Sequence, residues 1–274
     1  MKKFFFYISL VLAGSFFLSC KQKPIPYGNN PDAGKYYNIR GFTMYCEVYG
    51  TGKPLLMIHG NGGSIKTFAA NIPYFSKKYK VIIADSRAQG KSKDDADSLS
   101  FEMMADDEAA LLDALHVDSA YVIGWSDGGN SALLLAIRHP GKVIKLASTG
   151  ANLWPDSSAI TAAEWLDDKA VYDSLKDKKR MTAEEKTGWK LFLLDWQQPN
   201  ISLASLHSIQ SPSLIICGDH DVITTAHTAL ISQNIPQSNL WIVPNSGHAT
   251  FKEHKDEFNK KIDDFFAKPF RSNK

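Results

Sequence analysis

The 274-residue sequence has few cysteines and little excess charge. Its 31 basic and 29 acidic residues give a formal net charge of only +2. It has no basic stripe interleaved with aromatic residues, so nothing predicts nucleic-acid binding. It also lacks a metal-ligand cluster, a cofactor fingerprint and an internal repeat, so we expect neither a metal nor a cofactor. The length suits one large α/β domain with an insertion.

The single long apolar run is at the N-terminus, and it is too short to span a bilayer comfortably as a mature helix. It covers Phe4 to Leu18, follows two lysines and ends at Ser19-Cys20. This pattern predicts a signal peptide over residues 1–19. Its end resembles the lipobox of bacterial lipoproteins, which implies export and lipidation of Cys20 as a membrane anchor. Lys21 resembles an outer-membrane sorting signal. The alternative is an ordinary cleaved signal in which Cys20 is incidental.

Residues 20–35 contain this cysteine and then a stretch rich in proline, glycine and asparagine, which predicts a tether between anchor and domain. The other two cysteines, Cys46 and Cys217, lie in separate apolar runs. We therefore expect two buried thiols rather than a disulfide.

Short apolar runs recur from residue 36 onward. Residues 36–50 read as a hairpin with Gly41 at the turn, and six almost continuous apolar runs follow, separated by helical patterns such as 102–115 and 253–266. Continuous short runs are typical of parallel strands buried on both faces. The alternation predicts a mostly parallel eight-stranded sheet flanked by helices, with ligands beyond the carboxyl ends of its strands. The six runs are 55–58, 81–84, 121–123, 143–147, 214–217 and 240–243.

One segment interrupts the alternation. Residues 152–207 contain four tryptophans and no convincing strand, so we interpret them as a helical cap between the two parts of the core, 36–151 and 208–270. Most of these tryptophans should pack inside the cap. Because ligand pockets are mainly apolar and aromatic, Trp154 and Trp189 are candidates for substrate contact.

The sequence Gly124-Trp125-Ser126-Asp127-Gly128 reads G-x-S-x-G, between a β-type run and a helix-forming stretch. In that context the serine occupies a sharp strand-to-helix turn, and small neighbours let strand and helix approach closely. Ser126 is therefore the candidate nucleophile, the alternative being a serine in an ordinary glycine-rich turn.

A serine hydroxyl needs a base, and the base needs an orienting acid. His248 lies between the last strand and the last helix and is the candidate base. Asp221 and Asp219 both follow the strand at 214–217, and we choose Asp221 because Val222 and Ile223 can pin its loop. His59 should brace a loop. We expect the remaining helix-associated histidines at the surface: His116, His139, His207, His227 and His254.

The negative oxygen of a tetrahedral intermediate needs hydrogen-bond donors. We expect the backbone N–H groups of Asp127 and Asn61 to serve, since one follows the nucleophile and the other lies in the loop after the strand at 55–58. Gly60 and Trp125, beside these donors, are further candidates for substrate contact. The glycine-rich loop lacks a Gly-Lys-Ser/Thr ending, which argues against a phosphate cradle.

These motifs together resemble the α/β-hydrolase fold family. The segment from Asp85 to Ser92 is similar to the family's D-x-R-G-x-G-x-S, with Ala88 where glycine is usual. The turn around Ser126 resembles most closely the valacyclovir-hydrolase-like (biphenyl-hydrolase-like) serine esterases. The resemblance implies hydrolysis of a small carboxylic ester through an acyl-enzyme.

Other reactions use the same three residues: carbon–carbon bond hydrolysis, amide hydrolysis, perhydrolysis and acyl transfer. A non-catalytic binding protein on the same fold is an alternative of another class. Asp127 allows one further hypothesis, that its carboxylate binds a substrate ammonium group; the alternative is that it caps the helix that begins there.

Overall fold

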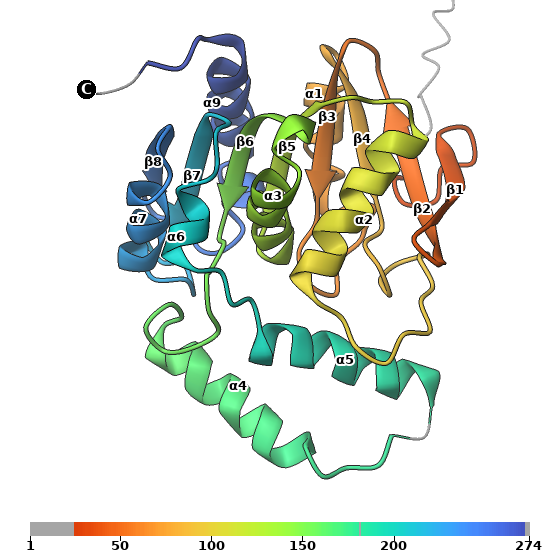
Figure 1. Ribbon diagram of the computed structural model, residues 1–274, viewed down its shortest axis with the longest axis vertical. Coiled ribbons are helices and arrows are strands. Elements are labelled where there is room, and N and C mark those ends of the chain that lie inside the picture. Colours follow the sequence, from red (N-terminus) through yellow and green to blue (C-terminus); the bar gives the residue numbers. More distant parts are fainter. Residues whose placement is uncertain (1–24, 181, 272–274) are drawn as a thin grey trace, which may run out of the picture.

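The computed structural model describes residues 25–180 and 182–271 (Figure 1). The proposed signal peptide and Cys20 therefore lie outside the described residues. One eight-stranded sheet has the order β1-β2-β4-β3-β5-β6-β7-β8, in which β2 is antiparallel to its neighbours and the other pairs are parallel. The predicted strands are thus confirmed. They are β1 (Gly34–Ile39), β2 (Phe42–Tyr49), β3 (Lys53–Ile58), β4 (Tyr79–Ala84), β5 (Ala120–Trp125), β6 (Val143–Thr149), β7 (Ser213–Gly218) and β8 (Ser238–Val243).

The helices follow the strands in alternation, as the sequence predicts. The elements are η1 (Ile65–Phe68), α1 (Ile72–Phe75), α2 (Phe101–Ala114), α3 (Asp127–Arg138), η2 (Pro140–Lys142), α4 (Ala162–Leu175), α5 (Ala183–Gln197), α6 (Leu203–Leu206), α7 (Thr225–Gln233), α8 (Thr250–Glu253) and α9 (Lys255–Ala267).

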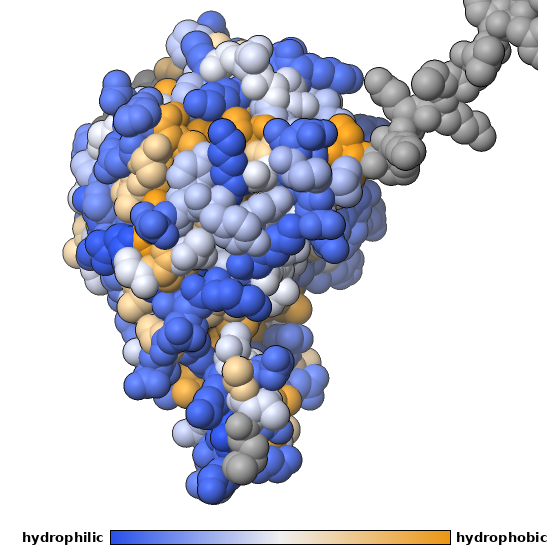
Figure 2. Space-filling view, turned by 90° about the vertical axis from the view of Figure 1, so that its right-hand side faces the viewer, coloured by the Kyte–Doolittle hydropathy of each residue, from blue (hydrophilic) through white to orange (hydrophobic). Residues whose placement is uncertain are grey.

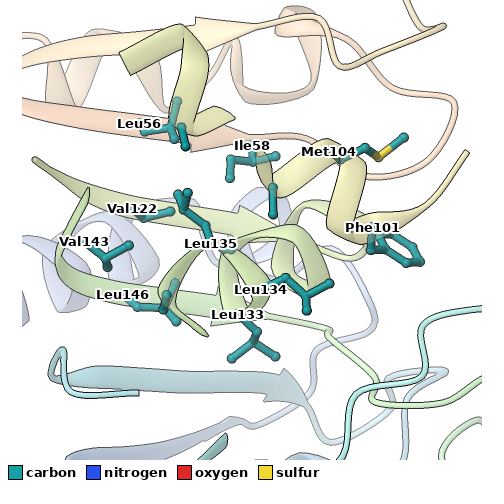
Figure 3. Close-up of a cluster of buried hydrophobic side chains, with 14 of the residues drawn as sticks. Leu56, Ile58, Phe101, Met104, Val122, Leu133, Leu134, Leu135, Val143 and Leu146 are labelled. Carbon is teal, nitrogen blue, oxygen red and sulfur yellow. The ribbon is translucent and has the colours of Figure 1, made fainter. Parts of the chain in front are cut away.

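Alternate residues of each parallel strand enter two separate cores. Leu56, Val122 and Leu146 pack against α2 and α3 on one face, as the side chains in Figure 3 show. Leu55 and Ile123 belong to the opposite core, which includes residues of α1 and α9. Burial on both faces explains why these strands read as continuous apolar runs. It also fixes the register of each strand and so the position of the residues at its end.

Helices α4 and α5 lie beyond the carboxyl ends of the parallel strands, apart from the two helical layers (Figure 1). They form the narrow lower part of the molecule in Figure 2. Helix α4 has no buried residue, whereas α5 buries Lys190 and Leu194 against the core. The Lys190 ammonium lies 3.2 Å from the Asp94 carboxylate, which fastens α5 to the loop after β4. We refer to α4 and α5 as the lid.

The segment before β1 is attached to the core over its described part. The backbone N–H groups of Gly28 and Asn30 each donate to the carboxylate of Glu47 at 2.8 Å. Glu47 is fully buried on β2 and also accepts from two tyrosine hydroxyls. The expectation of a tether through residue 35 is therefore wrong for the described residues before β1. The buried Glu47 carboxylate has no cation beside it, so it takes hydrogen bonds from the backbone of this segment.

Two further expectations concern cysteines and membranes. Cys46 and Cys217 are free and buried, as expected. Over the part of the chain that the structure describes, no helix has the length and apolar character needed to cross a bilayer.

Candidate active site

Ser126 occupies a strained turn between β5 and α3. Its φ of 57° and ψ of −123° lie in a region that non-glycine residues rarely adopt. A β-carbon on Gly124 would collide with the carbonyl oxygen of Gly128, and one on Gly128 with the carbonyl oxygen of Ile58. The glycines of the motif therefore permit the close contact that holds the turn in this conformation.

Ser126, His248 and Asp221 form one hydrogen-bonded chain. Ser126 Oγ lies 2.9 Å from His248 Nε2, and His248 Nδ1 lies 2.6 Å from Asp221 Oδ1. The three residues come from the ends of β5, β8 and β7, which the parallel sheet brings to the same edge. In this geometry the imidazole can take the serine proton while the carboxylate holds its tautomer.

The loop after β7 places its two aspartates differently. Asp221 has a buried side chain and accepts the backbone N–H of Ile223 at 3.0 Å. Asp219 instead accepts the backbone N–H of Ser246 at 3.1 Å and is more exposed. The structure therefore brings Asp221, and not Asp219, to the imidazole.

Trp125 supports the histidine loop. Its Nε1–H donates to the carbonyl oxygen of His248 at 2.9 Å, and the two rings lie 5.5 Å apart. Gly150, with φ 65°, lies directly beneath the imidazole, where a β-carbon would come within 2.7 Å of His248 Cε1. Both residues fix the imidazole position, so Trp125 contacts the base rather than the cavity described below.

The loop after β3 passes over the nucleophile. A β-carbon on Gly60 would lie 2.9 Å from Ser126 Cβ, so only glycine fits there. His59 is buried and braces this loop, since its Nε2 accepts the Ser86 backbone N–H at 3.0 Å. Asn61 follows, and its side-chain amide donates to the carbonyl oxygen of Leu191 on α5 at 3.0 Å. The loop thus contacts both the nucleophile and the lid.

A cavity of about 260 Å³ opens above Ser126 between the core and the lid. Of the predicted substrate contacts, Asp127 lines it, whereas Gly60, Trp125, Trp154 and Trp189 do not. The full lining is Ser126, Asp127, Asn152, Ile160, Glu164, Asp168, Phe192, Asp195, Trp196, Val222, Ile223 and His248.

The two cap tryptophans that were predicted to contact substrate pack elsewhere. The Trp154 ring lies edge-on to His227 at 4.8 Å, and its Nε1–H donates to Ser158. Trp189 stacks with Tyr172 and Phe192, and the Arg180 guanidinium lies over its ring. Phe192 and Trp196, which lie further along α5, line the cavity instead.

The acidic character of this cavity was not predicted from the sequence. Four carboxylates line it, from Asp127, Asp195, Glu164 and Asp168, and no lysine or arginine does. A lone aspartate at position 195 within an otherwise apolar and aromatic run was a usable signal, as was the four-residue spacing of Glu164 and Asp168.

These carboxylates raise one another's proton affinity. Burial, and then the negative charge of Asp195, raise the pKa of Asp127 well above its usual range, and the two carboxyl groups share a hydrogen bond. Burial, Glu164 and Asp195 raise the pKa of Asp168 to about 6. Since Asp195 contacts solvent in the cavity and Asp127 is buried, we assign the shared proton to Asp127.

His227 corrects one sequence expectation. It is buried rather than at the surface, and its Nε2 accepts the backbone N–H of Leu153 at 2.9 Å. Burial lowers the pKa of His227 to about 4. His227 is buried because it lies on the side of α7 that faces the core. There it holds the start of the segment that leads from β6 to the lid.

Comparison with known proteins gives the same fold. Residues 53–179 match a family described as alpha/beta hydrolase fold. The chain is 29% identical to serine hydrolase BPHL of Mus musculus, over 83% of this chain and 84% of that protein. It is 26% identical to 2-hydroxymuconate semialdehyde hydrolase of Pseudomonas sp. (strain CF600), over 87% and 95%.

A solved structure also shares the fold of this chain. The enol-lactonase from Burkholderia xenovorans LB400 has a TM-score of 0.70 at 20% sequence identity, over 85% of this chain and 100% of the other. With the sheet order and the Ser126 turn, these likenesses identify the class of protein. The chain has the α/β-hydrolase fold and is similar to hydrolases of that fold.

Proposed function

We propose that this protein is a serine hydrolase that cleaves a small carboxylic ester through an acyl-enzyme. The observation that carries the proposal is the continuous hydrogen-bonded chain from Ser126 Oγ through His248 to Asp221. Its geometry suits nucleophilic attack with proton transfer. The cavity above Ser126 has room for a small acyl group.

The reaction follows from these positions. Ser126 Oγ attacks the ester carbonyl carbon as its proton passes to His248 Nε2, and Asp221 stabilises the resulting imidazolium. The backbone N–H groups of Asp127 and Asn61 donate to the carbonyl oxygen as it becomes negative. His248 then protonates the departing alcohol. Water, deprotonated by the same imidazole, releases the acid and restores Ser126.

The charge of the cavity favours a substrate with an ammonium group near the ester carbonyl. Asp127 directly follows the nucleophile, is only 4% exposed and lines the cavity. The alternative role of helix cap requires a backbone N–H that donates to the carboxyl group, yet within the described chain its buried Oδ2 receives no donor. An amino-acid ester would supply that partner.

Carbon–carbon bond hydrolysis is the second candidate, because several relatives are named for it, among them 2-hydroxy-6-oxo-6-phenylhexa-2,4-dienoate hydrolase of Burkholderia cepacia. Such a dienoate carries a carboxylate. A cavity lined by four carboxylates and no lysine or arginine would repel it. The cavity charge therefore favours ester hydrolysis. Amidase, perhydrolase, acyltransferase and binding roles gain no specific support.

The test is hydrolysis of a series of p-nitrophenyl esters and amino-acid ethyl esters by the purified protein, beside Ser126→Ala. The control is Ser208→Ala, which removes an exposed serine. We expect activity on short esters, lost by several orders of magnitude in Ser126→Ala alone. Absence of activity on every ester would contradict the proposal.

We further propose that the protein is exported and anchored to a membrane through a lipid on Cys20. The N-terminal sequence supports this proposal. Metabolic labelling with a palmitate analogue, in the full-length protein and in Cys20→Ala, tests it. Equal labelling of both proteins would count against the anchor.

A further inference from the structure

The lid contributes three of the four carboxylates in the cavity, and the mechanism uses none of the three. Glu164 and Asp168 lie one turn apart on α4, and Asp195 lies on α5. The charges of Asp195 and Glu164 both act on Asp168, and Asp195 also hydrogen-bonds to Asp127. The four groups therefore form a continuous acidic path, from beside the nucleophile to the outer part of the cavity.

Among the described residues, none of these carboxylates pairs with a lysine or arginine, although the lid is rich in lysine; the only positive charge that acts on Asp195 is that of the His248 imidazolium. On the outer side of α4, Asp173 forms salt bridges with both Lys169 and Lys176. The cavity face of the same helix carries acidic groups only. Asp173 is thus neutralised by lysines, whereas Glu164 and Asp168 face the cavity without one, and this difference favours an external cation there.

Asp127 is the second and independent observation. It is 4% exposed and lines the cavity. It shares hydrogen bonds with Asp195 and the Asn61 side chain, but its buried Oδ2 receives no donor in the described structure. A buried carboxyl oxygen without a partner is costly, so a ligand that donates a hydrogen bond there would be favoured. Within the described chain, no three or more His, Cys, Asp or Glu side chains are grouped to hold a metal ion. An organic cation fits better.

We propose that the cavity recognises a substrate with two cationic groups, as in an ester of lysine or ornithine. The proposal rests on the proposed function and extends it. Asp127 and Asp195 bind the ammonium next to the reacting carbonyl, and this ammonium takes the place of the proton that the two carboxyl groups otherwise share. Glu164 and Asp168 bind the second ammonium at the far end of a short aliphatic chain, which crosses the apolar lining of Phe192 and Ile223.

A binding experiment tests this site without catalysis. In the Ser126→Ala protein, calorimetry compares lysinamide with norleucinamide, which has the same α-ammonium and a similar chain but no second cation. We expect lysinamide to bind at least about tenfold more tightly, as for one added charge-assisted contact. Adding Glu164→Gln and Asp168→Asn should remove the difference. Asp167→Asn should retain it, since Asp167 is exposed on the same helix and outside the cavity.

Equal affinity for the two amides in the Ser126→Ala protein would overturn the inference, whether or not the lid variants fold. Circular dichroism of each variant checks its fold. Hydrolysis separates this result from the proposed function: lysine ethyl ester should exceed norleucine ethyl ester in kcat/KM by a similar factor with Ser126 intact. Selective binding of lysinamide without hydrolysis of either ester would leave the cation site standing and refute the ester hydrolase.

Discussion

Asp221 Oδ1 lies 2.6 Å from His248 Nδ1 and also accepts the backbone N–H of Ile223 at 3.0 Å. The backbone contact holds the carboxylate in place while it orients the imidazole. The neighbouring Asp219 has its own backbone donor from Ser246 and lies on the other side of the loop. Of these two aspartates, Asp221 therefore holds the imidazole and Asp219 holds the turn.

Replacing Asp221 with asparagine should lower kcat by a factor on the order of 10⁴, because the amide favours the wrong imidazole tautomer, as seen in serine proteases. Ester hydrolysis under saturating substrate measures the loss. Asp219→Asn is the matched control and should change kcat by only a few-fold. Similar losses in both variants would mean that the 2.6 Å contact does not orient the base.

Replacing Asp127 with asparagine should reduce kcat/KM for an α-amino-acid ester far more than for a neutral ester of the same size. The carboxylate would bind the ammonium, whereas the backbone N–H that donates to the oxyanion is kept in the variant. We expect a difference of about 10- to 100-fold between the two substrates, as for a partly buried charge pair. Equal losses on both esters would rule out ammonium recognition by Asp127.

The stability of the protein should depend on the proton of Glu108. This side chain is fully buried on α2, and burial raises its pKa to about 8 from 4.5. The folded state keeps the proton where the unfolded chain loses it. Protonated Glu108 therefore contributes its full stabilisation of the folded state below pH 4.5, and this contribution is lost as the pH rises toward 8.

Glu108→Gln should remove that dependence. Between pH 5 and 8 the variant should gain up to about 1.4 kcal/mol of unfolding free energy per pH unit relative to the wild type. Urea unfolding at several pH values measures it, with Glu102→Gln, partly exposed on the same helix, as control. Parallel pH profiles for wild type and Glu108→Gln would show that Glu108 ionises without cost.

Glu47→Gln should loosen the segment before β1. The amide nitrogen would face the backbone N–H of Gly28 or Asn30, so one donor loses its acceptor inside the protein. We expect a loss of about 1–3 kcal/mol in unfolding free energy. We also expect faster proteolysis within residues 25–33. Asp32→Asn, an exposed change in the same segment, should leave both unchanged.

The strands and the turn at Ser126 were predictable because each depends on local pattern. Burial on both faces makes a strand continuously apolar, and the strained turn requires glycine at fixed positions. The order of strands then brings Asp221 and His248 to Ser126, so their assembly follows from topology.

The lid was less predictable because helix α4 has no buried residue and therefore no strong apolar period. Which tryptophan lines the cavity depends on position along α5: Trp189 and Trp196 lie two turns apart on the same face, and only Trp196 reaches the cavity. His227 and the segment around Gly28 were predicted wrongly because each is fixed by a residue distant in the sequence. The partner of His227 is Leu153, and the partner of Gly28 is Glu47.

The contact between Asn61 and α5 has a consequence for the timing of catalysis. Asn61 is the proposed oxyanion donor through its backbone, and its side chain donates to the Leu191 carbonyl on the lid. A lid that swings away to exchange substrate for product breaks that contact and frees the loop carrying the donor. The enzyme would then be able to stabilise the transition state only while it is closed, so a substrate too large to be enclosed would be held without being cleaved.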